Sequence, residues 1–523
     1  MIVAVTVNGD GLRAHTQKAL EALQRDKVPA RLLAHDASLW GPDAESEASV
    51  RLGWLDVLEV SWKLVPELLQ LRAELREEGI DRVVLCGMGG SSLAPEVICK
   101  NADVALTVLD STHPDQVRAA LTGDLQRTVV VVSSKSGGTL ETDSQRRSFV
   151  DAFTQVGIDP KRRLVVVTDP GSPLEQLARD EGYRAVFLAD PHVGGRYSAL
   201  TAFGLVPSAL AGADIELLLD QANSFAAHLS EDDNAGLQLG AALGADGRDK
   251  IAIDADASPL PGFGDWAEQL IAESTGKQGK GLLPVVVEPD APEAQWPASD
   301  VHVVRVAGDP PPIGTSVAGN LGQQLLAWEY AVAVSGRLLG INPFDQPDVE
   351  SAKQAARGLL DEQPEPEKPA FTDGSIDVYA TEGLLSGQLT AEGAIARLLS
   401  LVPRNGYLAV MAYLDRVRDG QFATVRASLA RRIERPVTFG WGPRFLHSTG
   451  QYHKGGPPVG VYLQVTGNVT QDLSIPGRDF TYGTLITAQA VGDAKVLADH
   501  GRPVLRLHLR SGDALGQLQQ ALA

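Results

Sequence analysis

Cysteine is scarce in this chain, and neither a long apolar run nor an excess of positive charge is present. The two cysteines, Cys86 and Cys99, are too few for a disulfide framework, and their spacing matches no zinc-binding pattern. We therefore expect a protein of a reducing compartment, namely the cytoplasm.

The charge and hydropathy of the chain exclude several classes of partner. No stretch of about 18 consecutive apolar residues occurs, and the first residues form no basic leader with an apolar core. The formal net charge is −20, whereas binding to nucleic acids or anionic membranes depends on neutralising phosphates. We expect no membrane and no nucleic-acid partner. A small anionic metabolite is compatible with this charge, because local dipoles and a few cations can bind it.

The order of apolar patterns predicts an α/β protein. The chain has 523 residues, enough for two or three domains. Residues 1–79 carry apolar residues at helical spacing, which predicts an α-helical N-terminal segment. From residue 80, short β-branched runs such as RVVLCG and TVVVVSS alternate with helical segments. This alternation predicts two tandem doubly wound parallel-sheet domains, over 80–212 and 213–361.

A third region follows a candidate linker. The stretch EQPEPEKP, residues 362–369, is rich in Pro and Glu, which is typical of a linker. Residues 370–523 predict a smaller C-terminal α/β domain. In it we expect AEGAIARLLSLV and YLAVMAYL to be helical and VTFGWG to be a strand.

The stretch TVVVVSSKSGGTLET predicts an anion site. A buried β-branched strand runs directly into a loop of hydroxyls and glycines, just before a predicted helix. Unpaired backbone N–H groups and the positive end of the helix dipole converge at such a point. The loop residues Ser134, Lys135, Ser136 and Thr139 therefore predict a phosphate-ester site, with a loop that binds no ligand as the alternative.

A second loop of this kind lies one strand earlier. The sequence GMGGSS, which includes Gly90 and Ser91, follows the predicted strand RVVLC. Ligands of open α/β sheets bind outside the carboxyl ends of the strands. Two such loops on consecutive strands indicate one shared phosphate or sugar site.

Four further polar residues are candidates for chemistry. Arg196 lies between glycines and a helix start, where it could hold negative charge that develops on a substrate oxygen. Gln269 and Glu273 share one face of a predicted helix, where Glu273 could act as a general base. Lys353 could donate a proton or bind an anionic oxygen. The alternatives are a surface salt bridge for the arginine and solvated positions for the glutamate and the lysine.

Five motifs occur in order along residues 81–360: GMGGSSLAP, SSKSGGTLET, GGRYSALTAFGL, EQLIAESTGK and NPFDQPDVESAKQ. Together they resemble the successive signatures of the phosphoglucose isomerase (glucose-6-phosphate isomerase) family, which is built from two sugar-isomerase (SIS) domains. The resemblance implies an aldose–ketose isomerase of glycolysis and gluconeogenesis. Such an enzyme interconverts glucose 6-phosphate and fructose 6-phosphate through a cis-enediol. The resemblance also implies a homodimer that needs no metal or organic cofactor.

The resemblance implies a role for each candidate residue. The phosphate would be held by Ser134, Lys135, Ser136 and Thr139, with Gly90 and Ser91 beside the sugar. Glu273 would move the proton between C2 and C1, and Arg196 would stabilise the enediolate oxygen. Gln269 would lie near the phosphate. Gln346 and Lys353 match the last motif, in which the lysine helps to open the sugar ring.

One departure from the family concerns the ring-opening histidine. The family carries it in a Gly-Thr-Asn-Gly-Gln-His stretch, but the interval 277–340 of this chain holds only His302, without those neighbours. The C-terminal region resembles the isomerase half of transaldolase/phosphoglucose isomerase fusion proteins, and it contains the loop FLHSTGQYHKGGP. We hypothesise that His447 or His453 of this loop supplies the acid/base group, from the same chain or from a neighbouring subunit. The alternative is a structural loop.

Two other functions stay open at this point. The chain could be an isomerase of another sugar phosphate, such as mannose 6-phosphate. It could also be a sugar-phosphate-binding regulator that does not turn its ligand over. The presence of Glu273, Arg196 and Lys353 together argues against a regulator, because a sensor needs the phosphate loop but no base.

Overall fold

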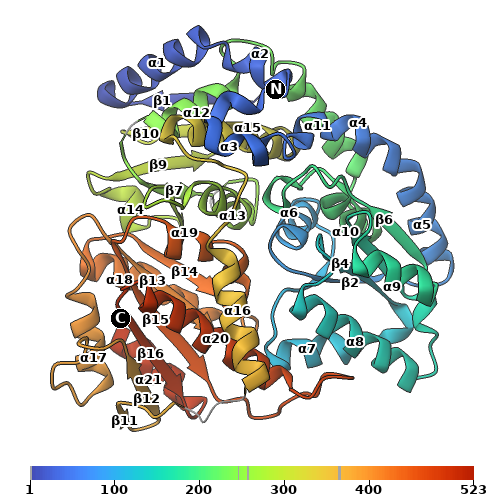
Figure 1. Cartoon of the computed structure of the whole chain (residues 1–523), viewed down its shortest axis with the longest axis vertical. Helices are drawn as coiled ribbons and strands as arrows, with labels where there is room; N and C mark the ends of the chain where they lie inside the picture. The colour runs from blue at the N-terminus through green and yellow to red at the C-terminus, as the bar shows by residue number, and fades with distance from the viewer. Residues whose placement is uncertain (1–2, 246, 256–257, 363–366, 523) are drawn as a thin grey trace.

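Three sheets organise the protein (Figure 1). The computed structural model describes residues 3–245, 247–255, 258–362 and 367–522. The first sheet is entirely parallel, with the strand order β3-β2-β4-β5-β6. Its strands are β2 (Arg82–Gly87), β3 (Thr107–Leu109), β4 (Thr128–Ser133), β5 (Leu164–Thr168) and β6 (Ala185–Leu188). All six residues of β4 are buried, as its β-branched run predicts for a strand covered on both faces.

The second sheet contains an N-terminal strand that the sequence analysis missed. Its order is β1-β10-β9-β7-β8, and β1 pairs antiparallel with β10. The strands are β1 (Ala4–Asn8), β7 (Lys250–Asp254), β8 (Leu283–Val287), β9 (Val301–Val306) and β10 (Gly314–Ala318). The segment 1–79 is therefore helical only after its first strand, and that strand closes the edge of a sheet formed by residues 250–318.

The third sheet has the order β11-β12-β16-β15-β13-β14. Its strands are β11 (Phe371–Asp373), β12 (Ile376–Ala380), β13 (Tyr407–Tyr413), β14 (Val437–Trp441), β15 (Gly460–Gly467) and β16 (Val504–Leu509). The expectation that YLAVMAYL is helical is wrong, because this run forms β13, which is buried at every residue. A short run that is apolar at nearly every position suits either a buried strand or a buried helix, and here the tertiary structure selects the strand.

Helices cover the sheets (Figure 1). The N-terminal helices are α1 (Asp10–Arg25), α2 (Val28–Leu33), α3 (Pro42–Ala48), α4 (Val57–Ser61) and α5 (Val65–Glu77). Those that follow, up to the second sheet, are α6 (Leu93–Asn101), α7 (Pro114–Leu121), α8 (Leu140–Gln155), α9 (Pro173–Glu181), α10 (Ala202–Ala211), α11 (Ile215–Ala226) and α12 (Ala235–Ala245). The remaining helices are α13 (Phe263–Thr275), α14 (Pro292–Gln295), α15 (Leu321–Leu339), α16 (Val349–Glu362), α17 (Ala391–Leu399), α18 (Val425–Ile433), α19 (Gly450–Gly455), α20 (Tyr482–Asp499) and α21 (Asp513–Leu522).

The parallel strands of all three sheets follow one order. When the parallel strands of each sheet are numbered in chain order, their order across the sheet is 2-1-3-4. These are β3-β2-β4-β5, β8-β7-β9-β10 and β14-β13-β15-β16, and the first sheet adds β6 as a fifth strand. In this order the crossovers change direction between the first and third strands, which opens a crevice at the carboxyl ends. The C-terminal region therefore repeats the strand order of the two preceding units, although it lacks the Gly/Ser loops of the first unit.

The C-terminal region is packed into the rest of the molecule. Tyr407 and Tyr452 share a buried cluster with Leu283 of the second sheet. On the other side, Tyr482 packs into the core beneath Val130 of the first sheet. This packing brings loops of all three units to one place. Residues 363–366 of the expected linker lie outside the described residues.

Candidate active site

The site is built where two glycine-containing loops touch. A Cβ on Gly90, in the 3-10 turn η4 (Gly89–Ser91), would lie 2.0 Å from the carbonyl oxygen of Gly195, which opens the turn η7 (Gly195–Tyr197). Gly89 has a φ of +56°, and a Cβ there would lie 2.8 Å from the carbonyl oxygen of His447. Any side chain would push these loops apart. Gly90 and the buried Ser91 thus lie beside both Arg196 and the C-terminal loop.

The predicted phosphate loop follows β4 at the same edge of the sheet. The hydroxyls of Ser134 and Thr139 lie 3.0 Å apart, and the Gly138 N–H donates to Ser136 Oγ at 3.3 Å. The Lys135 ammonium is paired with Asp169 and donates to the Pro191 carbonyl at 3.2 Å. The hydroxyls therefore converge, while the lysine amine is held to one side.

Arg196 is fixed by a full set of acceptors. It is 3% exposed, and Nε donates to Ser274 Oγ at 2.8 Å. Nη1 donates to Gln346 Oε1 at 2.8 Å, and Nη2 donates to the Pro343 carbonyl at 2.7 Å. The guanidinium of Arg196 is therefore held rigidly, and the structure brings the predicted residue Gln346 directly onto it.

Glu273 lies on α13, in front of this guanidinium. Its Oε2 is 3.6 Å from Arg196 Nη1, and Gln269 Nε2 donates to the same oxygen at 3.3 Å. Burial raises the pKa of Glu273. The charges of Arg196, His447 and Lys353 lower it, but burial has the larger effect. A carboxylate with a raised pKa holds a proton more readily, which suits a group that must accept and return one.

His447 is paired with a carboxylate that the sequence analysis did not single out. In the turn η9 (Arg444–His447), His447 Nε2 lies 3.1 Å from Oε1 of Glu141, in the first turn of α8. Burial would raise the pKa of Glu141, but the charge and hydrogen bond of His447 outweigh it and, with Lys353, bring the pKa to about 2. Gln269 Nε2 also donates to the His447 carbonyl at 2.9 Å. This ion pair therefore lies beside Glu273.

A residue of α20 fixes the carboxylate of this pair. Gln489 Nε2 donates to Glu141 Oε1 at 2.7 Å, while its Oε1 accepts from the Thr112 hydroxyl at 2.6 Å. The hydroxyl sets the orientation of the amide, and the amide sets the orientation of the carboxylate. Glu141 had a weak sequence signal, as an acid at a helix N-terminus, whereas Gln489 had none.

Lys353 lies on α16 and is half buried. Its charge lowers the pKa of both Glu141 and Glu273. The structure therefore brings Lys353 within electrostatic reach of both carboxylates, as expected for a residue of the same site.

The structure does not bring His453 into this group. Its ring lies among Tyr407, Phe445 and Tyr462, with centroid separations of 5.3–6.2 Å. Neither ring nitrogen has a hydrogen-bond partner among the described residues. Burial lowers the pKa of His453 to about 3, with the charges of Lys454 and Arg502 acting in the same direction. Of the two candidates, only His447 contacts groups of the site, since α19 turns His453 into the core.

One group of possible metal ligands lies elsewhere. Among the described residues, His113, Asp115 and Asp415 bring ligand atoms within 4.8 Å of one another. Arg118 and Arg418 donate to the two oxygens of Asp115, at 2.6 and 2.7 Å. His113 Nδ1 accepts the Asp115 N–H at 3.3 Å. These contacts occupy both oxygens of Asp115 and the Nδ1 of His113, which caps the helix α7.

The family of the chain is defined by sequence comparison. The sequence profile of phosphoglucose isomerase matches residues 75–243. The chain is 30% identical over 341 residues to a probable glucose-6-phosphate isomerase of Haloarcula marismortui, a match that covers 54% of this chain and 78% of the relative. It is 32% identical over 343 residues to a probable glucose-6-phosphate isomerase of Natronomonas pharaonis. This match covers 54% of this chain and 79% of the relative.

Solved structures support the fold. A hypothetical protein of Thermus thermophilus has a TM-score of 0.59 and 24% identity, with 68% of this chain and 100% of that chain covered. A glucose-6-phosphate isomerase of Chlamydia trachomatis has a TM-score of 0.55 and 19% identity. This match covers 70% of this chain and 90% of that chain. Tandem parallel sheets covered by helices place the chain in the class of doubly wound α/β proteins. Within that class, the chain belongs to the phosphoglucose isomerase family.

Within the described residues, no helix combines the length and the apolar character that crossing a bilayer requires.

Proposed function

We infer that the chain is an aldose–ketose isomerase that interconverts glucose 6-phosphate and fructose 6-phosphate. The observation that carries this inference is the placement of Glu273, a buried carboxylate of raised pKa, 3.6 Å from the fixed guanidinium of Arg196. A movable proton and a nearby fixed positive charge are what an enediolate intermediate requires.

Proton transfer is assigned to Glu273. The carboxylate removes the proton from C2 of the open-chain aldose and returns it to C1, through a cis-enediol intermediate. Arg196 stabilises the negative charge that develops on the substrate oxygen, and its four fixed contacts mean that it needs no reorganisation. The carbonyl of the open sugar acidifies the adjacent C–H, so this chemistry requires no metal or organic cofactor.

Ring opening is assigned to His447, with Glu141 and Lys353. The Glu141 carboxylate holds the His447 ring in place at 3.1 Å, and an imidazole fixed in this way can donate a proton to the ring oxygen of the sugar. Lys353 adds a second cation beside both carboxylates. This assignment supplies a ring-opening histidine to a chain whose residues 277–340 lack the family's histidine motif.

The substrate phosphate is assigned to the loop after β4. Ser134, Ser136 and Thr139 offer hydroxyls, and the N-terminus of α8 offers its dipole. Lys135 contributes its charge at the edge of the loop, and Ser91 lies beside the sugar. Gln269 bridges Glu273 and the C-terminal loop, and Gln346 holds Arg196.

A single chain supplies all these groups. The family resemblance implies a homodimer, but Glu273, Arg196, Lys353 and the pair of Glu141 and His447 come together without a second subunit. We propose that each chain carries a complete site whether or not it dimerises. We also propose a cytoplasmic location, in keeping with the two free, buried cysteines, and a small-molecule substrate without a nucleic-acid partner.

A coupled assay of fructose 6-phosphate conversion tests the function, with mannose 6-phosphate in parallel. We expect Glu273→Gln to lower kcat by about 10³-fold or more, because an amide cannot accept the proton, and to leave ligand binding intact. The matched control is Glu268→Gln on the same helix. Burial raises the pKa of Glu268 to about 8, with the charge of Asp265 acting in the same direction, so its neutral carboxyl resembles an amide.

Two outcomes would contradict the assignment. Full turnover in the Glu273→Gln protein would remove Glu273 from the mechanism. Tight binding of sugar phosphates by the wild-type protein, without turnover of any of them, would favour a regulator.

A further inference from the structure

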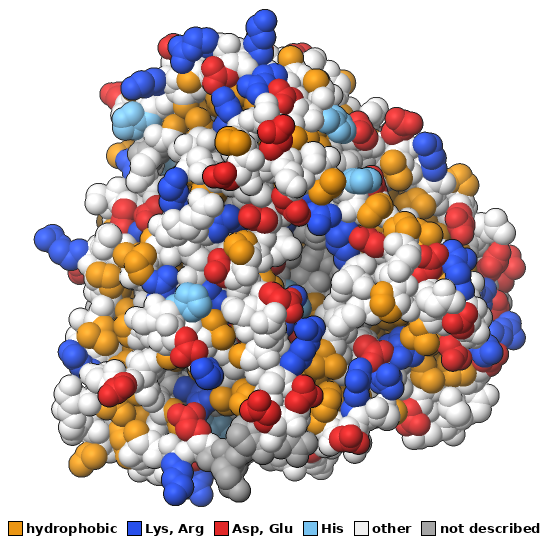
Figure 2. All heavy atoms as spheres, viewed as in Figure 1, with side chains coloured by type: hydrophobic (Ala, Val, Ile, Leu, Met, Phe, Trp, Pro, Cys, Tyr) orange, Lys and Arg blue, Asp and Glu red, His pale blue; other side chains and the backbone are white. Residues whose placement is uncertain are grey.

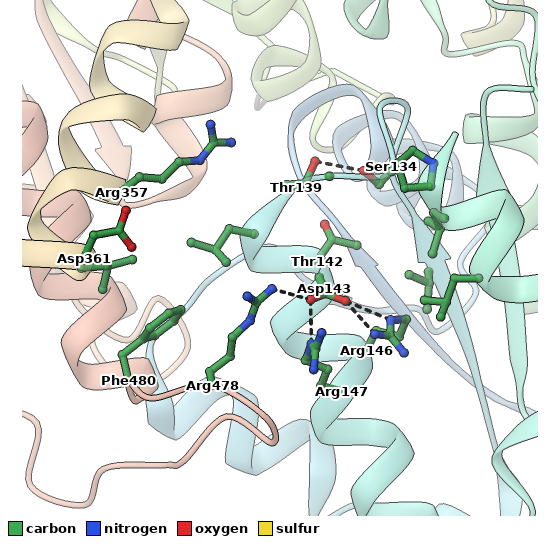
Figure 3. Close-up of a pocket in the computed structure, with 18 residues that line it drawn as sticks. Ser134, Thr139, Thr142, Asp143, Arg146, Arg147, Arg357, Asp361, Arg478 and Phe480 are labelled. Atoms are coloured by element: carbon green, nitrogen blue, oxygen red, sulfur yellow. Dashed lines mark hydrogen bonds and ion pairs between the residues drawn. The ribbon is translucent and has the colours of Figure 1, made fainter. Parts of the chain in front are cut away.

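A pocket of about 580 Å³ lies beside the phosphate loop, between α8 and α16 (Figure 3). Ser134 and Thr139 form its upper wall, and Phe480 lies on the opposite side in the segment before α20. The volume is within the range of small-molecule sites. None of Glu273, Arg196, His447 and Lys353 lines it, so this pocket adjoins the groups assigned to proton transfer without containing them.

The pocket wall holds one carboxylate among three guanidinium groups. Asp143 Oδ1 accepts from Arg146 Nη2 at 2.7 Å. Its Oδ2 accepts from Arg147 Nε at 2.7 Å and from Arg478 Nη2 at 2.8 Å. A single negative charge faces three positive charges, so pairing within the protein leaves an excess of positive charge on this wall.

A fourth arginine faces this wall from α16. Arg357 lines the pocket together with Asp361, and its Nη1 is 3.3 Å from Glu350 at an exposed position. The lining therefore contains four arginines and two aspartates, in a chain whose formal net charge is −20. Figure 2 shows Lys and Arg side chains over α8 and α16 on either side of a hollow in this face.

These arginines come from three separate parts of the chain. Arg146 and Arg147 lie on α8, Arg357 lies on α16, and Arg478 lies in the segment before α20. Arg147 Nη1 also donates to the Pro476 carbonyl at 3.4 Å, which ties that segment to α8. Only the folded chain assembles this positive wall, and it does so next to the hydroxyls of the phosphate loop.

We propose that this pocket binds a small polyanion with two or more linked phosphate groups, and that the ligand reaches the hydroxyls of Ser134 and Thr139. Guanidinium groups pair with phosphate oxygens in bidentate fashion, and several of them around one pocket favour a multiply charged ligand over a monophosphate. Because the pocket and the phosphate loop share a wall, the bound polyanion competes with substrate. This last consequence rests on the proposed function.

Titration calorimetry of the full chain with inorganic pyrophosphate, at low ionic strength, tests the pocket directly. We expect Arg147→Gln combined with Arg478→Gln to weaken pyrophosphate binding by about tenfold or more, because each lost contact is charge assisted. Turnover of fructose 6-phosphate should stay within about twofold, since neither arginine belongs to the assigned machinery, and this retained activity also shows that the variant folds.

The matched control is Arg404→Gln combined with Arg431→Gln. It removes two exposed arginines of the third unit that do not line the pocket, and it should leave pyrophosphate affinity unchanged. Arg357→Gln, at a half-exposed position, provides a second test that does not disturb Asp143.

Two results would overturn the proposal. The first is no binding of pyrophosphate by the wild-type chain, and the second is equal affinity in the wild-type and double-variant proteins. Ser134→Ala should also weaken pyrophosphate binding, because the ligand reaches the hydroxyl of Ser134. Calorimetry needs no turnover, so pyrophosphate binding by an inactive protein would support the pocket while rejecting the isomerase.

Discussion

His447 and His453 lie six positions apart in one loop, yet they have opposite environments. His447 is paired with the buried carboxylate of Glu141 and lies beside Gln269 and Glu273. His453 is enclosed by aromatic rings and has no hydrogen-bond partner on its ring among the described residues. A carboxylate partner orients the ring of His447, whereas burial without a polar partner favours the neutral form of His453. The same residue type in one loop is therefore suited to catalysis at one position and to packing at the other.

The largest difference between the two histidines should be in turnover. We expect His447→Gln to lower kcat by about 10²- to 10⁴-fold, the usual range for a lost general acid, with little change in KM because the phosphate loop is intact. The matched variant His453→Gln should stay within about threefold of wild type. Steady-state kinetics of both proteins checks this, and equal losses would show that the contrast is not functional.

The pairing of His447 with Glu141 predicts that the two act as one unit. We expect Glu141→Gln to lower kcat by about 10²-fold, because the imidazole loses the carboxylate that orients it. The double variant Glu141→Gln/His447→Gln should be no slower than His447→Gln alone, since residues that act together are not additive. Losses that multiply in a double-mutant cycle would mean that the two residues act independently.

The smallest effect concerns stability and depends on pH. The pKa of His453 is about 3 in the folded protein and about 6.5 when unfolded. Between these values only the unfolded chain binds the proton, so stability is complete above pH 6.5 and falls as the pH decreases. From pH 6.5 to about pH 5 the loss should be roughly 2 kcal/mol.

His453→Leu should remove this contribution of His453, which urea unfolding of the wild-type and variant proteins at both pH values measures as the difference between them. The control is His192→Leu at an exposed position, which should retain it. Glu141 contributes little in this window. Its lowered pKa, about 2, gives stability that is present above about pH 4.5 and is lost only as the pH falls towards 2. An unchanged pH dependence in the His453→Leu protein would contradict the buried, neutral assignment.

Sequence patterns predicted the local parts of this protein well. The β-branched run before Ser133 is a strand buried at every residue, and the polar loop after it precedes a helix, as its residues indicated. The order of the five motifs indicated the family to which the chain belongs. The run YLAVMAYL was misassigned, because its apolar pattern does not distinguish a buried strand from a buried helix. The domain boundaries and the roles of the site residues remain predictions.

The sequence alone determined most of the segments that form strands and helices, and where the polar loops after the strands begin, because these depend on residues close together in the chain. Only the tertiary structure distinguished the surroundings of the two histidines, since His447 and its partner Glu141 are 306 positions apart. It alone placed Gln489 on that carboxylate, 348 positions away, and gathered Arg478 with Arg146 and Arg147 around Asp143. Charges and hydrogen bonds act through space, so contacts between distant segments carry no signal in local patterns.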